Sequence, residues 1–133
     1  MSTQESIWTE ADIISRYTRE QAIEDGVLVD LMQDEMEAVC RQHYKYPVAC
    51  TAAVFSIMQK AVDNPRWGND YAGVLHDMLW MSRTHRQQLD PSTVLFDVII
   101  KGAGRQSIYR FKMVCGPGDD EEPVMTIMLT NED

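Results

Sequence analysis

The stretch TVLFDVIIK, residues 93–101, decides the fold, because its side chains alternate in character. A period of two is typical of a strand that buries one of its faces. Two further runs, residues 107–115 and 124–130, follow it, and a short segment with two glycines precedes each of them. Connections this short join neighbouring antiparallel strands, so the sequence predicts a three-stranded meander. On the first strand, the side predicted to face the core consists of Val94, Phe96, Val98 and Ile100.

Before Pro91 the apolar residues recur with the period of a helix. Thr18 and Gln21 have the spacing of a capping box, and Gly26 follows as a stop signal. The predicted helices cover residues 10–16, 19–25, 31–43, 51–62 and about 70–88, and the apolar run 27–29 is compatible with a brief strand. The predicted fold class is therefore α+β, with several N-terminal helices packed on one face of a C-terminal three-stranded antiparallel meander.

Length and composition bound the number of domains. The chain has 133 residues, of which 44% are hydrophobic and 25% charged, which are ordinary proportions for one globular domain. A domain of this size buries roughly two-thirds of the surface that its unfolded chain exposes, so its core needs neither a metal nor a disulfide. We expect a single domain over residues 1–133, with residues 1–8 flexible, and no cofactor.

Cysteine usage and hydropathy indicate a compartment. The three cysteines, Cys40, Cys50 and Cys115, are odd in number, and the polar N-terminus does not have the pattern of a secretory signal. Reduced thiols are typical of cytosolic proteins, so we expect a cytoplasmic protein. No apolar run approaches the roughly 20 residues that cross a bilayer, and we expect no membrane contact.

Charge is sorted by position along the chain. Residues 1–37 carry ten acids and two bases, residues 38–118 carry five acids and ten bases, and residues 119–133 carry six acids and no base. The net charge of −9 repels polyphosphate, so we expect no direct binding of nucleic acid, although the bases of the middle block could in principle line a nucleic-acid groove. Pairing of these bases with the acidic ends within the molecule is the favoured interpretation.

The segment GPGDDEEP, residues 116–123, has the composition of a solvated hairpin turn. It lacks the Lys, Ser or Thr of a phosphate loop and the alternating oxygen ligands of an EF-hand. Its carboxylates could instead dock against arginines or lysines of a partner, as phosphates do. The predicted partner-binding residues are Asp119, Asp120, Glu121 and Glu122 of this turn and Glu20, Glu24, Asp25 and Asp30 near the helix 19–25. We expect reversal of the four turn acids to leave the fold intact.

Two alternatives to a binding surface involve Cys and His. Cys40, His43 and Cys50 are soft ligands at short spacing, but a structural zinc site needs four ligands, so no metal site is predicted. A cysteine could act as a nucleophile beside His43, His76 or His85, yet no local pattern marks a thiol as activated, so no catalytic residue is predicted. His76 and His85, nine residues apart on one predicted helix, should lie on opposite sides of it.

Several segments resemble a known family. They are YTREQAIEDGVLVD at residues 17–30, YPVA at 46–49, DMLWM at 77–81, VCGPGDD at 114–120 and PVMTIML at 123–129. In this order they resemble a domain-of-unknown-function family of small bacterial proteins that is common on plasmids, phages and integrated elements. The resemblance covers about residues 17–130 and implies a mobile-element context, but it implies neither an activity nor a catalytic residue.

Charge and context together suggest a non-enzymatic, acidic protein-binding module of a mobile element. Its expected partner is a cytosolic protein with a basic, nucleic-acid-binding surface. The sharpest version is an inhibitor of bacterial defence, of anti-CRISPR or anti-restriction type, that acts by charge mimicry of nucleic acid. Two alternatives stay open: a small enzyme with a Cys/His or carboxylate site, and a plasmid or phage accessory protein.

Overall fold

The computed structural model describes residues 17–133. The flexible segment predicted at residues 1–8 and the helix predicted at residues 10–16 lie outside the described residues. The helices in the described part are α3 (Arg19–Glu24), α4 (Asp34–His43), α5 (Ala52–Asp63) and α6 (Tyr71–Thr84). The strands there are β1 (Leu28–Asp30), β2 (Val48–Thr51), β3 (Arg86–Asp90), β4 (Thr93–Ile99), β5 (Ile108–Pro117) and β6 (Pro123–Leu129).

The predicted meander is confirmed. Strands β4, β5 and β6 are consecutive antiparallel neighbours, with Phe96 opposite Phe111 and Met113 opposite Ile127. The alternation along β4 is also confirmed, because Val94, Phe96, Val98 and Ile100 are all buried.

The predicted strand count of three is wrong, because the six strands form one sheet in the order β1-β2-β6-β5-β4-β3. Strand β2 was not predicted, because its four residues are all buried and therefore do not alternate. β2 runs parallel to β6, and parallel strands are usually covered on both faces. The brief strand considered at residues 27–29 is present as β1.

Strand β3 corrects the predicted end of the helix at residues 70–88. The helix was expected to reach about Gln88, but α6 ends at Thr84 and the chain turns at once into β3. All five residues of β3 are exposed, so burial gives them no periodic pattern. Arg86 lies opposite Phe96 in an antiparallel pair. Pairing with the edge of β4 therefore overrides the helical propensity of this polar stretch.

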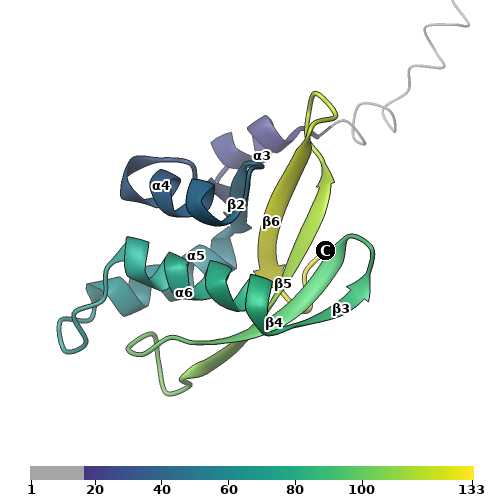
Figure 1. The fold of residues 1–133 in the computed structure, drawn as a ribbon. Helices are drawn as coiled ribbons and strands as arrows, with labels where there is room; N and C mark the ends of the chain where they lie inside the picture. Colours follow the sequence, from purple (N-terminus) through teal and green to yellow (C-terminus); the bar gives the residue numbers. More distant parts are fainter. Residues whose placement is uncertain (1–16) are drawn as a thin grey trace, which may run out of the picture.

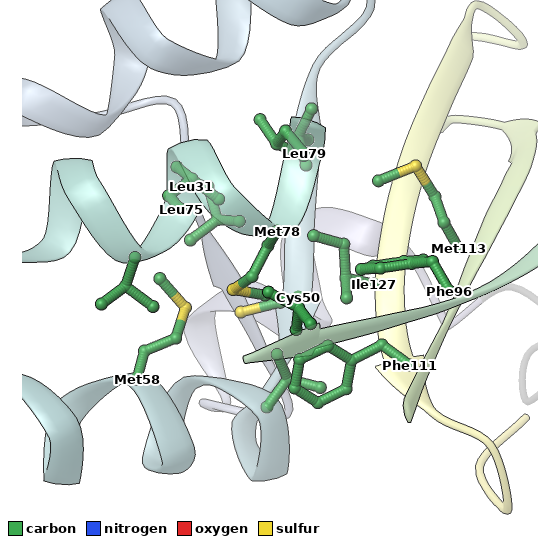
Figure 2. Packing of buried hydrophobic residues seen from close by; sticks show 14 of the residues in the cluster. Leu31, Cys50, Met58, Leu75, Met78, Leu79, Phe96, Phe111, Met113 and Ile127 are labelled. Carbon is green, nitrogen blue, oxygen red and sulfur yellow. The ribbon is translucent and has the colours of Figure 1, made fainter. Parts of the chain in front are cut away.

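The core lies between one face of the sheet and the helices α4, α5 and α6, which lie together on one side in Figure 1. Figure 2 shows the long side chains of this layer, with Met58 and Met78 from the helices facing Phe111 and Ile127 from the sheet. All four are essentially inaccessible to solvent. Methionine is flexible enough to fill the irregular space between helices and a twisted sheet. No helix among the described residues has both the length and the apolar character needed to cross a membrane.

Replacing Phe111 with Ala should lower the free energy of unfolding by about 3–5 kcal/mol, because it opens a cavity in the middle of this layer. The matched control is Ile108→Ala on the same strand, whose side chain is exposed. Urea denaturation of both variants measures the difference. A loss below about 1 kcal/mol for Phe111→Ala would contradict the central position of this ring.

Candidate functional site

The acidic turn between β5 and β6 contacts helix α3, although the two are about 100 residues apart in sequence. One carboxylate oxygen of Asp119 accepts a hydrogen bond from the backbone N–H of Arg19 at 2.7 Å. The other accepts from the backbone N–H of Glu20 at 3.0 Å. Figure 1 shows α3 beside this turn. The contact joins a helix of the first charge block to a turn of the last one.

The N-terminal amides of α3 have no partners within the helix, as in every helix, and with only six residues α3 depends on contacts outside it. The predicted capping box is confirmed, since Thr18 Oγ1 accepts from the Gln21 N–H and Gln21 Oε1 accepts from the Thr18 N–H. Asp119 satisfies the two amides between them. The negative charge also lies at the end of the helix where the helix dipole favours it.

The turn itself is a compact hairpin connection, as its composition predicted. The Gly118 N–H donates to the Glu122 carbonyl at 2.6 Å, and the Glu121 N–H donates to the Gly118 carbonyl at 3.0 Å. Glu121 has a φ of 66°, which lies in the left-handed region. Glu122 folds back and accepts from the Asp120 N–H at 3.1 Å. The side chains of Asp120 and Glu121 remain exposed at the tip.

Arg19 lies near two of these carboxylates, Asp119 and Glu122. Its guanidinium donates to Thr126 Oγ1 at 2.7 Å and to the Met125 carbonyl at 2.8 Å, which attaches α3 to β6. Burial lowers the pKa of Arg19, and the nearby carboxylates Asp30, Asp119 and Glu122 act in the opposite direction. Arg19 therefore has a structural role and offsets only part of the negative charge around it.

These contacts place the turn acids beside α3, and Asp30 lines a hollow with Arg19 and Glu122. We call this region the acidic surface, and it consists of Glu20, Glu24, Asp25, Asp30, Asp119, Asp120, Glu121 and Glu122. Glu24 and Asp25 lie at the other end of α3, which spans only about 9 Å. Asp25 accepts a hydrogen bond from the Tyr17 hydroxyl at 2.7 Å, which raises the pKa of that phenol.

The last acidic block is divided between two places. Glu132 is not part of the acidic surface, because its carboxylate accepts from Thr51 Oγ1 at 2.8 Å and from the Leu129 N–H at 2.7 Å. It thereby holds the end of the chain against β2 and β6. Sequence position alone did not separate this structural acid from the acids of the turn.

The bases of the middle block form no ion pair with the acidic surface in the described part of the chain, although Arg41 lines a hollow together with Asp30 and Glu122. The two ion pairs found among residues 17–133 join Arg110 to Asp97 at 2.8 Å and Arg41 to Glu37 at 2.9 Å. The first lies within the middle block, and the second spans one turn of α4. Pairing with the acidic ends, as the charge pattern suggested, is thus limited to one local contact.

The cysteines have the environment of structural side chains. Cys40 and Cys50 are buried, and burial is the main cause that raises the pKa of the first thiol to about 11 and of the second to about 12. Cys40 donates to the Leu31 carbonyl at 3.5 Å. A thiol held in this protonated state is a poor nucleophile. Within the described chain, no three His, Cys, Asp or Glu side chains converge as metal ligands.

Sequence reasoning missed a polar chain between α4 and α6. His43 Nε2 and His76 Nδ1 lie 2.9 Å apart, and Arg83 Nη1 lies 3.1 Å from His43 Nδ1. A guanidinium only donates, so His43 Nδ1 accepts and its Nε2–H donates to His76. His85, which caps α6, does not join these hydrogen-bonded side chains and instead bonds Thr84. The 33-residue separation of the two histidines hid the pair from any local motif.

The fold defines an α+β protein in which three helices cover one face of a mixed six-stranded sheet. A family model described as "Family of unknown function (DUF6573)" matches residues 4–133, and the chain belongs to that family. The resemblance to a domain-of-unknown-function family is thereby confirmed. No curated protein and no solved structure matches the chain.

Replacing Asp119 with Ala should lower the free energy of unfolding by about 0.5–2 kcal/mol, because two amides at the start of α3 lose their partner. The matched control is Asp120→Ala, which removes the same charge from an exposed neighbour and should cost less than about 0.5 kcal/mol. Urea denaturation of the two variants measures the difference. Equal losses would contradict the capping role. Reversal of all four turn acids should therefore disturb the fold, because Asp119 caps α3 and Glu122 accepts from the Asp120 N–H within the turn.

Acidification should destabilise the fold through His43. Burial, His76 and Arg83, in that order, lower the pKa of His43, so the unfolded chain takes up a proton first as the pH falls. The free energy of unfolding is therefore full above the ordinary histidine pKa of about 6.5 and declines as the pH drops below it. Urea denaturation on either side of that pH should show a smaller decline for His43→Gln than for the control His85→Gln. Equal declines in both variants would contradict the assignment.

Proposed function

We propose that this protein is a non-enzymatic binding module whose acidic surface engages a basic, nucleic-acid-binding face of a partner protein. The observation that carries the proposal is the pair of hydrogen bonds from Arg19 and Glu20 to Asp119. Through them, acids from two distant charge blocks become one surface on a short helix and a hairpin turn. Loops held on a rigid sheet are common places for recognition residues.

The electrostatics favour a basic partner over a small cation. Of the eight acids, Asp30, Asp119 and Glu122 act on the Arg19 guanidinium, and that guanidinium is already bonded to Met125 and Thr126. Carboxylates accept paired hydrogen bonds from arginine, as phosphate groups do. A surface of one sign also accelerates encounter with a surface of the opposite sign, and salt weakens this effect.

The sharpest form of the proposal is an inhibitor of bacterial defence, of anti-CRISPR or anti-restriction type, that occupies a site normally filled by nucleic acid. This form depends on the mobile-element context that the family resemblance implies. A plasmid or phage accessory protein with the same acidic surface is the alternative.

A Cys/His enzyme is less well supported, because Cys40 and Cys50 are buried thiols with raised pKa values and both nitrogens of His43 are already bonded.

Replacing Asp120 and Glu121 with Lys should slow association with the partner by about tenfold at low salt, because the attraction to a basic surface is reduced. The fold should stay intact, since these exposed side chains make no hydrogen bond that it needs. The control Glu35→Lys with Asp63→Lys changes the net charge equally. Both of its residues are exposed and lie near Tyr71 on the helical layer, away from α3.

The measurement uses a partner captured from bacterial lysate on the immobilised full chain and then titrated in purified form. Its association rate with wild type should fall as ionic strength rises, and nucleic acid should compete with the chain for the same site. If both double variants associate as fast as wild type at every salt concentration, the partner does not recognise the acidic surface.

A further inference from the structure

Strand β4 has an open edge at its C-terminal end. Strand β5 pairs with β4 as far as Ile99, but the pairing of β3 with β4 begins at Phe96. The Ile100 N–H donates to Ser107, which continues the β5 side of the ladder. Because backbone groups alternate in direction along a strand, those of Ile99 point to the other side. In the described part of the chain, no strand is paired with β4 there.

An apolar hollow of about 380 Å³ lies against this open edge. Trp80 and Met81 of α6 line one side of it, and Ile99 and Ile108 line the other. Trp80 is 48% exposed, Ile99 60% and Ile108 59%, which is unusual for three large apolar side chains that line one hollow. A second hollow of about 420 Å³ shares Met81 with the first and continues along β4 toward Arg86.

The other sheet edges have features that discourage strand addition. The outer strand β3 reads RQQLD, is exposed throughout and has an irregular register between Gln88 and Asp90. The opposite edge strand, β1, has only three residues. Polar side chains, bulges and short length are the usual means by which proteins protect an edge. The β4 edge instead combines unpaired backbone with apolar walls.

The charges at the hollow indicate what kind of segment fits. Asp97 is already bonded to the Arg110 guanidinium through both carboxylate oxygens, at 2.8 and 3.2 Å. Asp77 is exposed at the rim and takes part in neither ion pair of the described chain. A basic residue next to an apolar one would satisfy both the carboxylate and the hollow.

We propose that an extended segment of a partner protein, with alternating apolar and basic residues, adds to the sheet beside Asp97–Ile99 in line with β3. Its backbone hydrogen-bonds to the open edge of β4, and one apolar side chain fills the hollow between Trp80 and Ile108. A Lys or Arg on the same segment meets Asp77. This is strand addition to a sheet edge, in which main-chain bonds give affinity and a pocket gives specificity.

A second copy of this chain is a poorer occupant. Antiparallel pairing of two β4 edges around Val98 would set Ile100 of one copy against Phe96 of the other, where β3 is already paired. Each copy also carries a net charge of −9, so two copies repel each other, whereas a basic segment is attracted. The site is also separate from the acidic surface, since it lies on the β4 side of the sheet and at the end of β5 opposite to the 117–123 turn.

The test uses the full chain and the synthetic peptide acetyl-KVKIKVK-amide, followed by amide NMR. Saturating peptide should slow hydrogen exchange of the Ile99 amide by about tenfold, because that amide gains a strand partner. The double variant Ile99→Gln with Ile108→Gln should weaken the peptide affinity by about tenfold, since it removes the apolar wall. Leu89→Gln is the matched control, because Leu89 is 50% exposed on β3 outside the hollow, and its affinity should stay within about twofold.

Further outcomes separate this site from others. A peptide with proline in place of its central isoleucine should bind at least about tenfold more weakly, because proline lacks the backbone donor and disrupts the strand. If the peptide perturbs amides of Glu20 and Asp119 but not Ile99, it binds the acidic surface and the inference is wrong. A wild-type dimer that the Ile99/Ile108 variant dissociates in sedimentation would assign the edge to a second copy and overturn the peptide assignment.

Discussion

The parallel pairing of β2 with β6 is the contact on which the rest of the molecule depends. Val48, Ala49 and Cys50 lie opposite Met125, Thr126 and Ile127, and the Met125 N–H donates to the Pro47 carbonyl at 2.8 Å. This pairing joins the N-terminal β1–β2 unit to the C-terminal meander. It also sets α3 beside the β5–β6 turn, so the acidic surface exists only when the two halves of the sheet are joined. Chain segments more than 70 residues apart must meet for this, which is entropically the costliest kind of contact to close.

Sequence reasoning succeeded where a residue pattern had one buried face. The alternation along β4 predicted its inward side chains, and the capping box at Thr18 predicted the start of α3. It failed where burial was uniform. Strand β2 is covered on both faces and β3 is exposed on both, so neither alternates. Their existence depends on the neighbouring strands, which no local window contains.

The sequence predicted which acids form the candidate site, but not which hydrogen bonds they make. Counting charge singled out the turn acids, yet gave no indication that Asp119 caps α3 while Asp120 and Glu121 project from the tip. Nor did it show that the Glu132 carboxylate attaches the end of the chain to β2 and β6. The pair His43 and His76 and the apolar wall formed by Trp80, Ile99 and Ile108 are contacts through space between separate elements. A sequence pattern records only spacing along the chain, so contacts between separate elements are not visible in it.

The two proposed surfaces obey different physics, and this difference separates them experimentally. Attraction to the acidic surface is long-range and is screened within about 8 Å at physiological salt. Strand addition at the β4 edge depends mainly on main-chain hydrogen bonds and on apolar burial between Trp80 and Ile108, so salt should weaken it less, through the contact at Asp77 alone. One partner that used both surfaces would have to extend across the sheet from β1 to β4. Its association rate would then respond to Asp120 and Glu121, while its dissociation rate would respond to Ile99 and Ile108.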